Sequence, residues 1–276
     1  MRRIVFALLL VLMAAPGTAL AFDHTYRLWN SDLAQFNESG YVHYGAWKRN
    51  HERLDRYIAD MKDVGLREFG GWTPEQRTAF WINAHNALVI ARIIEAYPRV
   101  DEQRERHWLV AGQDVTTDDI RDKILRGTES RVPLLSEALG RDTSIAAGRD
   151  LRILFAICEG STVSPPLSES AYTGDGLSAQ LDRQVSRTLA NPSFLEVEPR
   201  LKIFRVAGFF RIYQRDFKTY QGHVLLFEKS GSGDRGLLRF VFPYLDKPMQ
   251  DVLLAKQKAR WRVEYRMPSD ALNGGD

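Results

Sequence analysis

The sequence has little cysteine and lacks the common metal and phosphate motifs. Cys158 is the single cysteine among 276 residues, so no disulfide can form within the chain. The six histidines are scattered, without the spacing of a motif such as H-E-x-x-H, and no G-x-G-x-x-G loop occurs. We therefore predict no metal and no cofactor. Packing must stabilise the fold, and 14 Phe, 10 Tyr and 6 Trp supply large side chains for it.

The sequence also lacks a large excess of basic over acidic residues. The chain has 38 Lys and Arg against 35 Asp and Glu, and two of these arginines stand at positions 2 and 3. Without those two, the formal net charge falls from +3 to +1. No basic block with interleaved aromatic residues occurs, so the sequence argues against binding to nucleic acid.

The longest apolar run lies near the N-terminus and is too short to span a membrane. It covers residues 4–15, which are 12 residues against the roughly 20 that a transmembrane helix needs. It follows two arginines and precedes Ala19-Leu20-Ala21, which has the spacing of a signal-peptidase site. We therefore predict a cleaved signal peptide at residues 1–21 and a soluble, periplasmic single domain at residues 22–276. A retained N-terminal anchor is the alternative.

Apolar periodicity favours a helix-rich fold with few strands. Residues 74–97 begin like a helix, because Thr73 and Gln76 can form a capping box and Pro74 fits the first turn. Residues 153–158 form an unbroken apolar run, which we interpret as a strand buried on both faces. The predicted fold class is α+β, a helix-rich single domain packed on a small mixed or antiparallel sheet. Further helices are expected at 23–36, 44–61, 116–126, 133–139, 209–217 and 236–256 and after a cap at Asp175, and further strands at 200–206 and 261–265.

The helix at 74–97 carries two amides on its apolar face. At 100° per residue, Asn83 and Asn86 fall among alanine and isoleucine side chains. A buried polar group without a partner costs roughly 1–3 kcal/mol, so both amides need specific partners. They either tie the helix to a neighbouring backbone segment or line a polar pocket. His85 falls on the opposite face, where a half-exposed surface histidine is favoured over a catalytic base.

The loop that follows residue 157 carries most of the candidate catalytic groups. Cys158 is interpreted as a buried core thiol rather than a nucleophile. Glu159 is either an ordinary loop carboxylate or a partly desolvated one, whose raised pKa would suit a general acid. Ser164 has the hydroxyl of a nucleophile, but the sequence places no histidine beside it. Together with His85, these three residues are the catalytic candidates.

Several segments follow the order of one known family. Residues 80–88, FWINAHNAL, are similar to a signature helix FWINxYNALT. Residues 164–167, SPPL, resemble the end of an S-x-S-C-P-P-L segment, and residues 171–182 resemble an A-Y…L-x-x-Q-L-D helix. Residues 213–217 match W-Y-x-x-D-F in its tyrosine, aspartate and phenylalanine. This set, over about residues 24–273, resembles the domain of unknown function 547 family of bacteria and plants.

The same resemblance identifies departures from the family pattern. Members usually read R-I-H-F-A-L-x-C-A-S-x-S-C-P-P-L over residues 152–167, and such a histidine with cysteines suggests thiol chemistry. Here Leu154 stands at the histidine position, and Glu159 and Ser164 stand at the cysteine positions. Cys158 lies one residue early, which on a strand would turn it to the opposite face. The resemblance therefore implies a scaffold without the family's thiol set.

Three functions remain open on these observations. The leading hypothesis is a non-catalytic periplasmic binding or structural module on a scaffold like that of thiol hydrolases. The alternative is a hydrolase of envelope peptides or amides that uses Glu159 or Ser164 in place of the family cysteines. A third is a protein that binds an envelope protein or peptide through surface aromatic residues. In the first two, a pocket between the helix and loop 159–166 would be lined by Trp81, Asn83, Asn86, Ser161, Tyr213 and Asp216.

Overall fold

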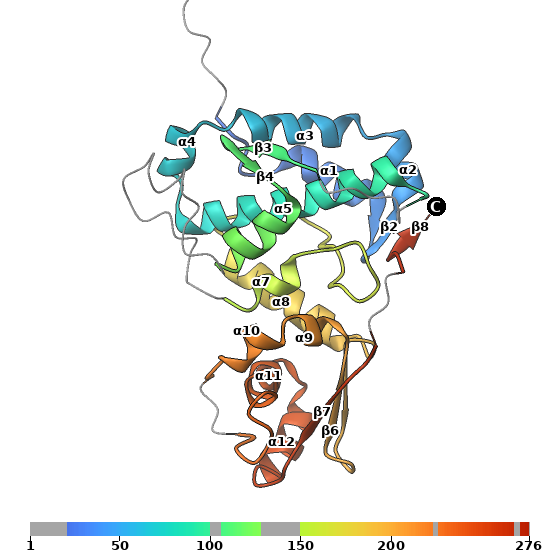
Figure 1. Ribbon diagram of the computed structural model, residues 1–276, viewed down its shortest axis with the longest axis vertical. Coiled ribbons are helices and arrows are strands. Elements are labelled where there is room, and N and C mark those ends of the chain that lie inside the picture. Colours follow the sequence, from blue (N-terminus) through green and yellow to red (C-terminus); the bar gives the residue numbers. More distant parts are fainter. Residues whose placement is uncertain (1–20, 100–105, 128–149, 223–225, 268–270, 276) are drawn as a thin grey trace, which may run out of the picture.

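Helices predominate over small sheets, as the sequence predicts for an α+β domain (Figure 1). The computed structural model describes residues 21–99, 106–127, 150–222, 226–267 and 271–275. Within these ranges no helix has the length and apolar character needed to cross a membrane. The helices are α1 (Arg27–Phe36), α2 (Tyr44–Arg49), α3 (Glu52–Asp63), α4 (Leu66–Gly71), α5 (Pro74–Ala96), the π-helix η2 (Asp119–Leu125), α7 (Ile153–Ala156), α8 (Leu177–Ala190), α9 (Phe209–Ile212), α10 (Gln214–Lys218), α11 (Arg235–Val241), the 3-10 helix η3 (Phe242–Tyr244) and α12 (Lys247–Ala255).

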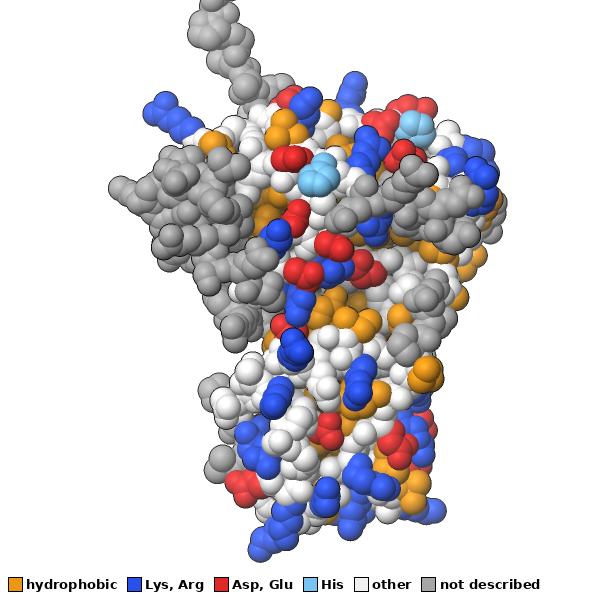
Figure 2. All heavy atoms as spheres, in the orientation of Figure 1, with side chains coloured by type: hydrophobic (Ala, Val, Ile, Leu, Met, Phe, Trp, Pro, Cys, Tyr) orange, Lys and Arg blue, Asp and Glu red, His pale blue; other side chains and the backbone are white. Residues whose placement is uncertain are grey.

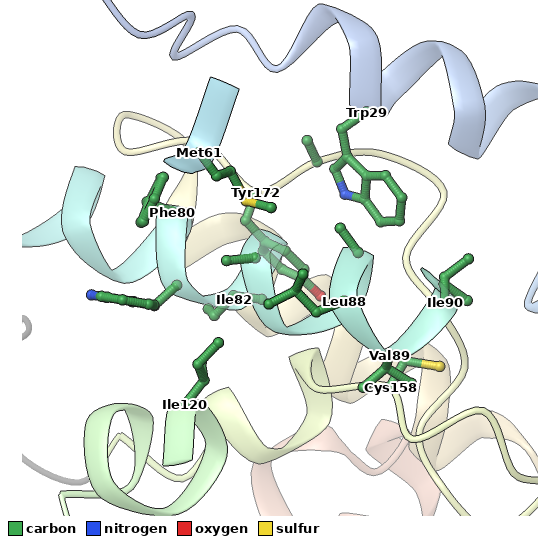
Figure 3. Packing of buried hydrophobic residues seen from close by; sticks show 14 of the residues in the cluster. Trp29, Met61, Phe80, Ile82, Leu88, Val89, Ile90, Ile120, Cys158 and Tyr172 are labelled. Carbon is green, nitrogen blue, oxygen red and sulfur yellow. The ribbon is translucent and has the colours of Figure 1, made fainter. Parts of the chain in front are cut away.

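The upper part of the molecule in Figure 1, which contains α1–α5, is the larger part, and α9–α12 belong to the smaller part below it. Helix α5 passes through the middle of the larger part and is buried on all sides over most of its length. Its N-terminus has the predicted capping box. Thr73 Oγ1 accepts the Gln76 N–H at 3.1 Å, and Gln76 Oε1 accepts the Thr73 N–H at 2.9 Å. Figure 3 shows side chains of other elements around the helix, among them Trp29 of α1, Met61 of α3 and Ile120 of η2. The helix is therefore the central element of the larger hydrophobic cluster.

Two hydrophobic clusters meet at α7 and α8. The larger surrounds α5, and the smaller lies among the C-terminal helices and strands. In α7, Ile153 belongs to the larger cluster, whereas Leu154 and Phe155 belong to the smaller one. In α8, Leu181 faces the larger cluster and Val185, one turn later, the smaller. Both helices thus contribute apolar side chains to both hydrophobic clusters, and in this way they connect the two clusters.

The strands form small sheets with both parallel and antiparallel pairs. In one sheet, Val42 pairs with Gly274 in parallel, so the C-terminal region returns to the N-terminal region. The backbones approach closely there, because a Cβ on Gly274 would lie 1.9 Å from the Val42 carbonyl oxygen. The strand orders are β1 (Asn37–Glu38), β2 (Tyr41–His43), β8 (Gly274–Gly275); β3 (Trp108–Val110), β4 (Gln113–Val115); and β5 (Leu195–Glu198), β6 (Ile203–Val206), β7 (Arg262–Tyr265).

Two predictions about local structure are wrong. Residues 153–158 are not a strand, because residues 153–156 form the helical turn α7, which ends at an extended Ile157. A short segment buried between two clusters is apolar at every position in either conformation, so its composition cannot distinguish them. Asp175 does not cap α8, whose N-cap is Gly176 without a side-chain bond; Thr173 Oγ1 accepts the Gly176 N–H instead. The helix predicted at 133–139 lies outside the described residues.

Most other predicted elements are present, although several are divided. The segment 44–61 contains α2 and α3, and the segment 209–217 is divided between α9 and α10 at Tyr213. The predicted interruption of 236–256 at two prolines is confirmed as α11, η3 and α12. The strands predicted near 200–206 and 261–265 are β6 and β7. The strands β1–β5 and β8 were not predicted.

Candidate functional site

The two asparagines of α5 hold neighbouring backbone segments in place. Asn86 Nδ2 donates to the Ala156 carbonyl at 2.9 Å, and its Oδ1 accepts the Cys158 N–H at 2.9 Å. Asn83 forms the equivalent pair with the carbonyl and N–H of Tyr172, at 2.8 and 3.0 Å. Both side chains are fully buried. They therefore tie the helix to backbone, which is one of the two alternatives, and they face no open pocket.

His85 is buried, and its prediction as a half-exposed surface residue is wrong. It has 0% exposure because α5 has no solvent face at this position. Its Nε2 lies 3.5 Å from Oε1 of Glu159, and its Nδ1 lies 3.4 Å from Oδ1 of Asn86. Each ring nitrogen thus faces an oxygen acceptor. The helix brings His85 directly to the loop that holds the other catalytic candidates.

Glu159 is held as a carboxylate, contrary to the general-acid hypothesis. Burial by itself would raise its pKa, but the His85 imidazole and the Arg121 guanidinium outweigh burial and lower that pKa to about 2. Arg121 Nη1 lies 3.2 Å from Glu159 Oε1. At neutral pH the side chain carries no proton to give to a leaving group. Its role here is that of a fixed negative charge.

The Glu159 carboxylate is one end of a network of charges that we call the ionic network. Arg121 also contacts Asp118 at 2.8 Å and Asp122 at 2.7 Å. Arg126 pairs with Asp122 and with Asp216 of α10, the latter at 2.7 Å. The network therefore joins η2 of the larger part to α10 of the smaller part. Figure 2 shows acidic and basic side chains gathered around the narrow middle of the molecule.

Two predicted pocket residues lie at the edge of this network and one lies apart from it. Tyr213 is 7% exposed, and the Arg126 guanidinium lies 5.0 Å from its ring centroid. Asp216 lines a cavity of about 330 Å³ beside Arg126 and Leu154. Trp81 is buried against aromatic neighbours in the core. The six predicted pocket residues are therefore not brought together around one cavity.

Cys158 directly precedes Glu159 in the chain, and its thiol is protonated at neutral pH. It is 1% exposed, as expected for a core thiol. Burial raises the pKa of the thiol to about 11, and the Gly160 N–H, 3.4 Å from Sγ, opposes that rise only in part. Asn273 Nδ2 lies 3.9 Å from Sγ and its Oδ1 accepts the Tyr44 hydroxyl at 2.5 Å. A thiol so placed is a weak nucleophile.

Ser164 uses its hydroxyl to close the loop. Its Oγ accepts the Glu159 N–H at 3.2 Å and lies 3.0 Å from the Ser161 carbonyl, to which it donates. Both bonds are to backbone, so this hydroxyl shapes the turn at 159–164. The arrangement differs from a nucleophile paired with an imidazole base.

A groove of about 480 Å³ with both polar and apolar walls opens beside Ser161 and Ser164. We call it the 161–166 groove. Such a volume falls within the range of roughly 300–1,000 Å³ that is typical of small-molecule sites. Its walls come from the β1–β2 turn, the 161–166 loop, the end of α8 and the β8 region. The lining residues are Ser39, Gly40, Tyr41, Ser161, Thr162, Ser164, Pro166, Arg187, Thr188, Asn191, Ser193, Phe194, Leu272, Asn273 and Gly274.

The sequence did not predict Arg121 or Arg187 as site residues. Arg121 contacts Glu159 of the loop, and Arg187 lines the 161–166 groove. Arg121 is 38 positions from Glu159, and Arg187 is more than 20 positions from the loop. Each belongs to a helix whose partner cannot be read from local spacing. The available signal was the acidic and basic alternation at residues 118–126, which predicts ion pairs within one helix but not the contact with the loop.

The comparisons with known proteins identify the family of this segment. Residues 69–187 match the model of the family described as "Protein of unknown function, DUF547". These residues form a segment of the DUF547 family. No curated protein and no solved structure matches the chain.

The DUF547 segment contains the features described above. It begins in α4, includes α5 with both asparagines, and ends at Arg187 in α8. The ionic network as far as Arg126, the loop with Glu159 and Ser164, and part of the 161–166 groove therefore lie within the match. The DUF547 description itself assigns no activity.

Proposed function

We propose that this protein is exported to the periplasm and binds a small polar ligand in the 161–166 groove without transforming it. Export is supported by the signal-like residues 1–21. Binding is supported by the groove, whose walls present hydroxyl, amide and guanidinium groups to solvent. A pocket with a few convergent polar groups is the usual form of a small-molecule site.

One observation carries the non-catalytic part of the proposal. Each of three candidate catalytic groups has a protonation state or a hydrogen-bonding partner that is unsuited to hydrolysis. Glu159 is ionised and paired with Arg121, Cys158 is a buried neutral thiol, and the Ser164 hydroxyl bonds to backbone. General acid catalysis needs a proton on the carboxyl group, and nucleophilic attack needs a thiolate or an activated hydroxyl.

Covalent labelling tests the absence of catalysis. Folded mature protein would be treated with a fluorophosphonate for serine nucleophiles and with iodoacetamide for thiols, before and after unfolding in urea. We expect no labelling of the folded protein and labelling of Cys158 only after unfolding. Ser186→Ala, which changes an exposed serine of α8, is the matched control for Ser164→Ala. Labelling of the folded wild type that disappears in Ser164→Ala would support the hydrolase instead.

Fractionation of a bacterial host tests export. The full chain should be recovered with periplasmic markers, and its mass should correspond to a chain that begins at Phe22. A variant in which Ala19 and Ala21 are both replaced by Arg should remain unprocessed, because a signal peptidase needs small residues there. Recovery of the wild type in the cytoplasm with residues 1–21 intact would contradict the proposal.

A further inference from the structure

We propose that the ligand of the 161–166 groove is a small hydroxylated anion, namely a sugar that carries a carboxylate or a phosphate group, and that Arg187 binds its charge. The inference rests on the proposed binding function and adds the chemical class of the ligand. It is argued from the charges and the hydrogen-bonding groups of the groove.

The charge of the groove comes from Arg187, which forms an ion pair with the exposed side chain of Glu169. Among the described residues that line the groove, Arg187 is the charged side chain. Its Nη2 lies 3.2 Å from Oε1 of Glu169, which is 59% exposed at the rim. Ser39 Oγ donates to the same carboxylate oxygen at 3.1 Å. Glu169 is not among the residues that line the groove, and because its side chain is exposed we expect a ligand carboxylate or phosphate to replace it as the partner of Arg187.

Several groups beside Arg187 are available to ligand hydroxyls. In the described part of the chain, the hydroxyls of Tyr41, Ser161 and Thr162 and the Nδ2 of Asn191 have no hydrogen-bond partner. Tyr41 is 47% exposed, so this aromatic residue lies at the surface beside these polar groups. Neutral donors and acceptors around one guanidinium suit a ligand with several hydroxyls and one anionic group.

Calorimetric titration of the mature protein tests this assignment. The probes are glucuronate for the carboxylate, glucose 6-phosphate for the phosphate, and glucose as the neutral reference. We expect at least one of the two acids to bind about 10-fold or more tightly than glucose, and the preferred acid identifies the source of the anion. Arg187→Gln should weaken the binding of that acid by about 10-fold or more, because a charge-assisted bond is lost.

Two further variants make the test specific to the groove. Glu169→Gln should strengthen binding of the acid, because it removes the internal competitor for Arg187. Arg183→Gln changes the same charge one turn earlier on α8, outside the groove, and should bind like the wild type. Failure of both acids to bind, or equal binding by the wild type and Arg187→Gln, would overturn the assignment. Binding of glucose as tightly as the acids would overturn the anion while leaving a groove that binds polar ligands.

An independent observation concerns the amino terminus. The Phe22 N–H donates to Oε1 of Glu68 at 2.6 Å. The Phe22 ring packs against those of Trp72 and Phe80, with centroid distances of 5.5 and 5.2 Å. We infer that cleavage after Ala21 leaves Phe22 as a docked terminus whose α-ammonium forms an ion pair with Glu68. Hydrolysis adds water across the Ala21–Phe22 bond, so that the carboxylate leaves with Ala21 and the amine stays on Phe22, where it is protonated at neutral pH.

The ion pair gives a pH dependence of known sign. A free α-amino group has a pKa of about 7.7–8.0, and the Glu68 carboxylate raises it in the folded state. The added stability is therefore full below about pH 7.5 and is lost as the pH rises through the raised pKa. The other titratable groups near this terminus are Asp23, His24, Tyr26, Tyr57 and Asp175.

A double-mutant cycle isolates the terminus from these neighbours. The chain beginning at Phe22 would be compared with one that retains Ala21, each with Glu68 or with Glu68→Gln, by urea unfolding between pH 7 and pH 10. We expect the urea midpoint of the Phe22 chain to exceed that of the Ala21 chain at pH 7 but not at pH 10. The difference should vanish in Glu68→Gln. Equal midpoints at pH 7, or a difference that survives in Glu68→Gln, would overturn the inference whatever the groove binds.

Discussion

The pairing of Glu159 predicts how strongly acid destabilises the fold. The Glu159 pKa of about 2 lies roughly two units below the value of about 4.3 for a free glutamate. At 1.36 kcal/mol per unit this corresponds to about 3 kcal/mol, or about 2–3 kcal/mol after allowance for its 27% exposed side chain. Because the folded-state pKa is lowered, this stability is full above about pH 5 and is lost as the pH falls toward 2.

Glu159→Gln removes the charge and should reproduce that loss at neutral pH. The free energy of unfolding in urea would be measured for the wild type and the variant between pH 7 and pH 3. At pH 7 we expect the variant to be about 2–3 kcal/mol less stable, since the carboxylate no longer pairs with Arg121 and His85. The gap between wild type and variant should shrink steadily toward pH 2, where Glu159 of the wild type is itself protonated.

The control and the refuting result follow from the same comparison. Glu228→Gln changes an exposed carboxylate and should stay within about 0.5 kcal/mol of the wild type throughout. If Glu159→Gln behaves like this control at pH 7, the carboxylate is not held by its neighbours. If its destabilisation is the same at pH 3 as at pH 7, the loss comes from packing rather than from charge.

Three other substitutions or reactions have defined outcomes. Asn86→Ala leaves two buried backbone groups without partners and should lower the free energy of unfolding by about 2–4 kcal/mol in urea, whereas Ser186→Ala should be nearly neutral. Gly160→Ala should cost about 1–3 kcal/mol by thermal denaturation, because φ is +73° and a Cβ would lie 2.2 Å from Cδ1 of Ile93; a stable variant would contradict the packing described. The Cys158 thiol should react with a disulfide reagent at pH 8 only at the rate of unfolding, and a fast reaction of folded protein would refute its burial.

Local signals predicted the parts of the fold that local interactions determine. The boundary of α5 follows from Thr73, Pro74 and Gln76, which interact within one turn, and the structure has that capping box. The need of Asn83 and Asn86 for partners also followed from the sequence, since a buried amide is costly alone. Which backbone segments they bind was not predictable, because the partners lie 70 to 89 positions away.

The error at His85 came from assuming that α5 has a solvent face. A helical wheel assigns residues to two faces, but a central helix buries both. The sequence contained a warning, because no charged residue occurs between Arg77 and Arg92. The same limit applies to Glu159, whose pKa depends on Arg121 and His85 and therefore on the packing of three separate elements. Burial alone would have shifted that pKa in the opposite direction.

The pairing of β2 with β8 has a consequence for the order of assembly. The edge of β2 at Val42 stays unpaired until residues 274 and 275 have been synthesised, even though its own strand is among the first to emerge. Final closure of the N-terminal region must then follow translation of nearly the whole polypeptide. A chain that cannot finish folding early remains a better substrate for transport in the unfolded state.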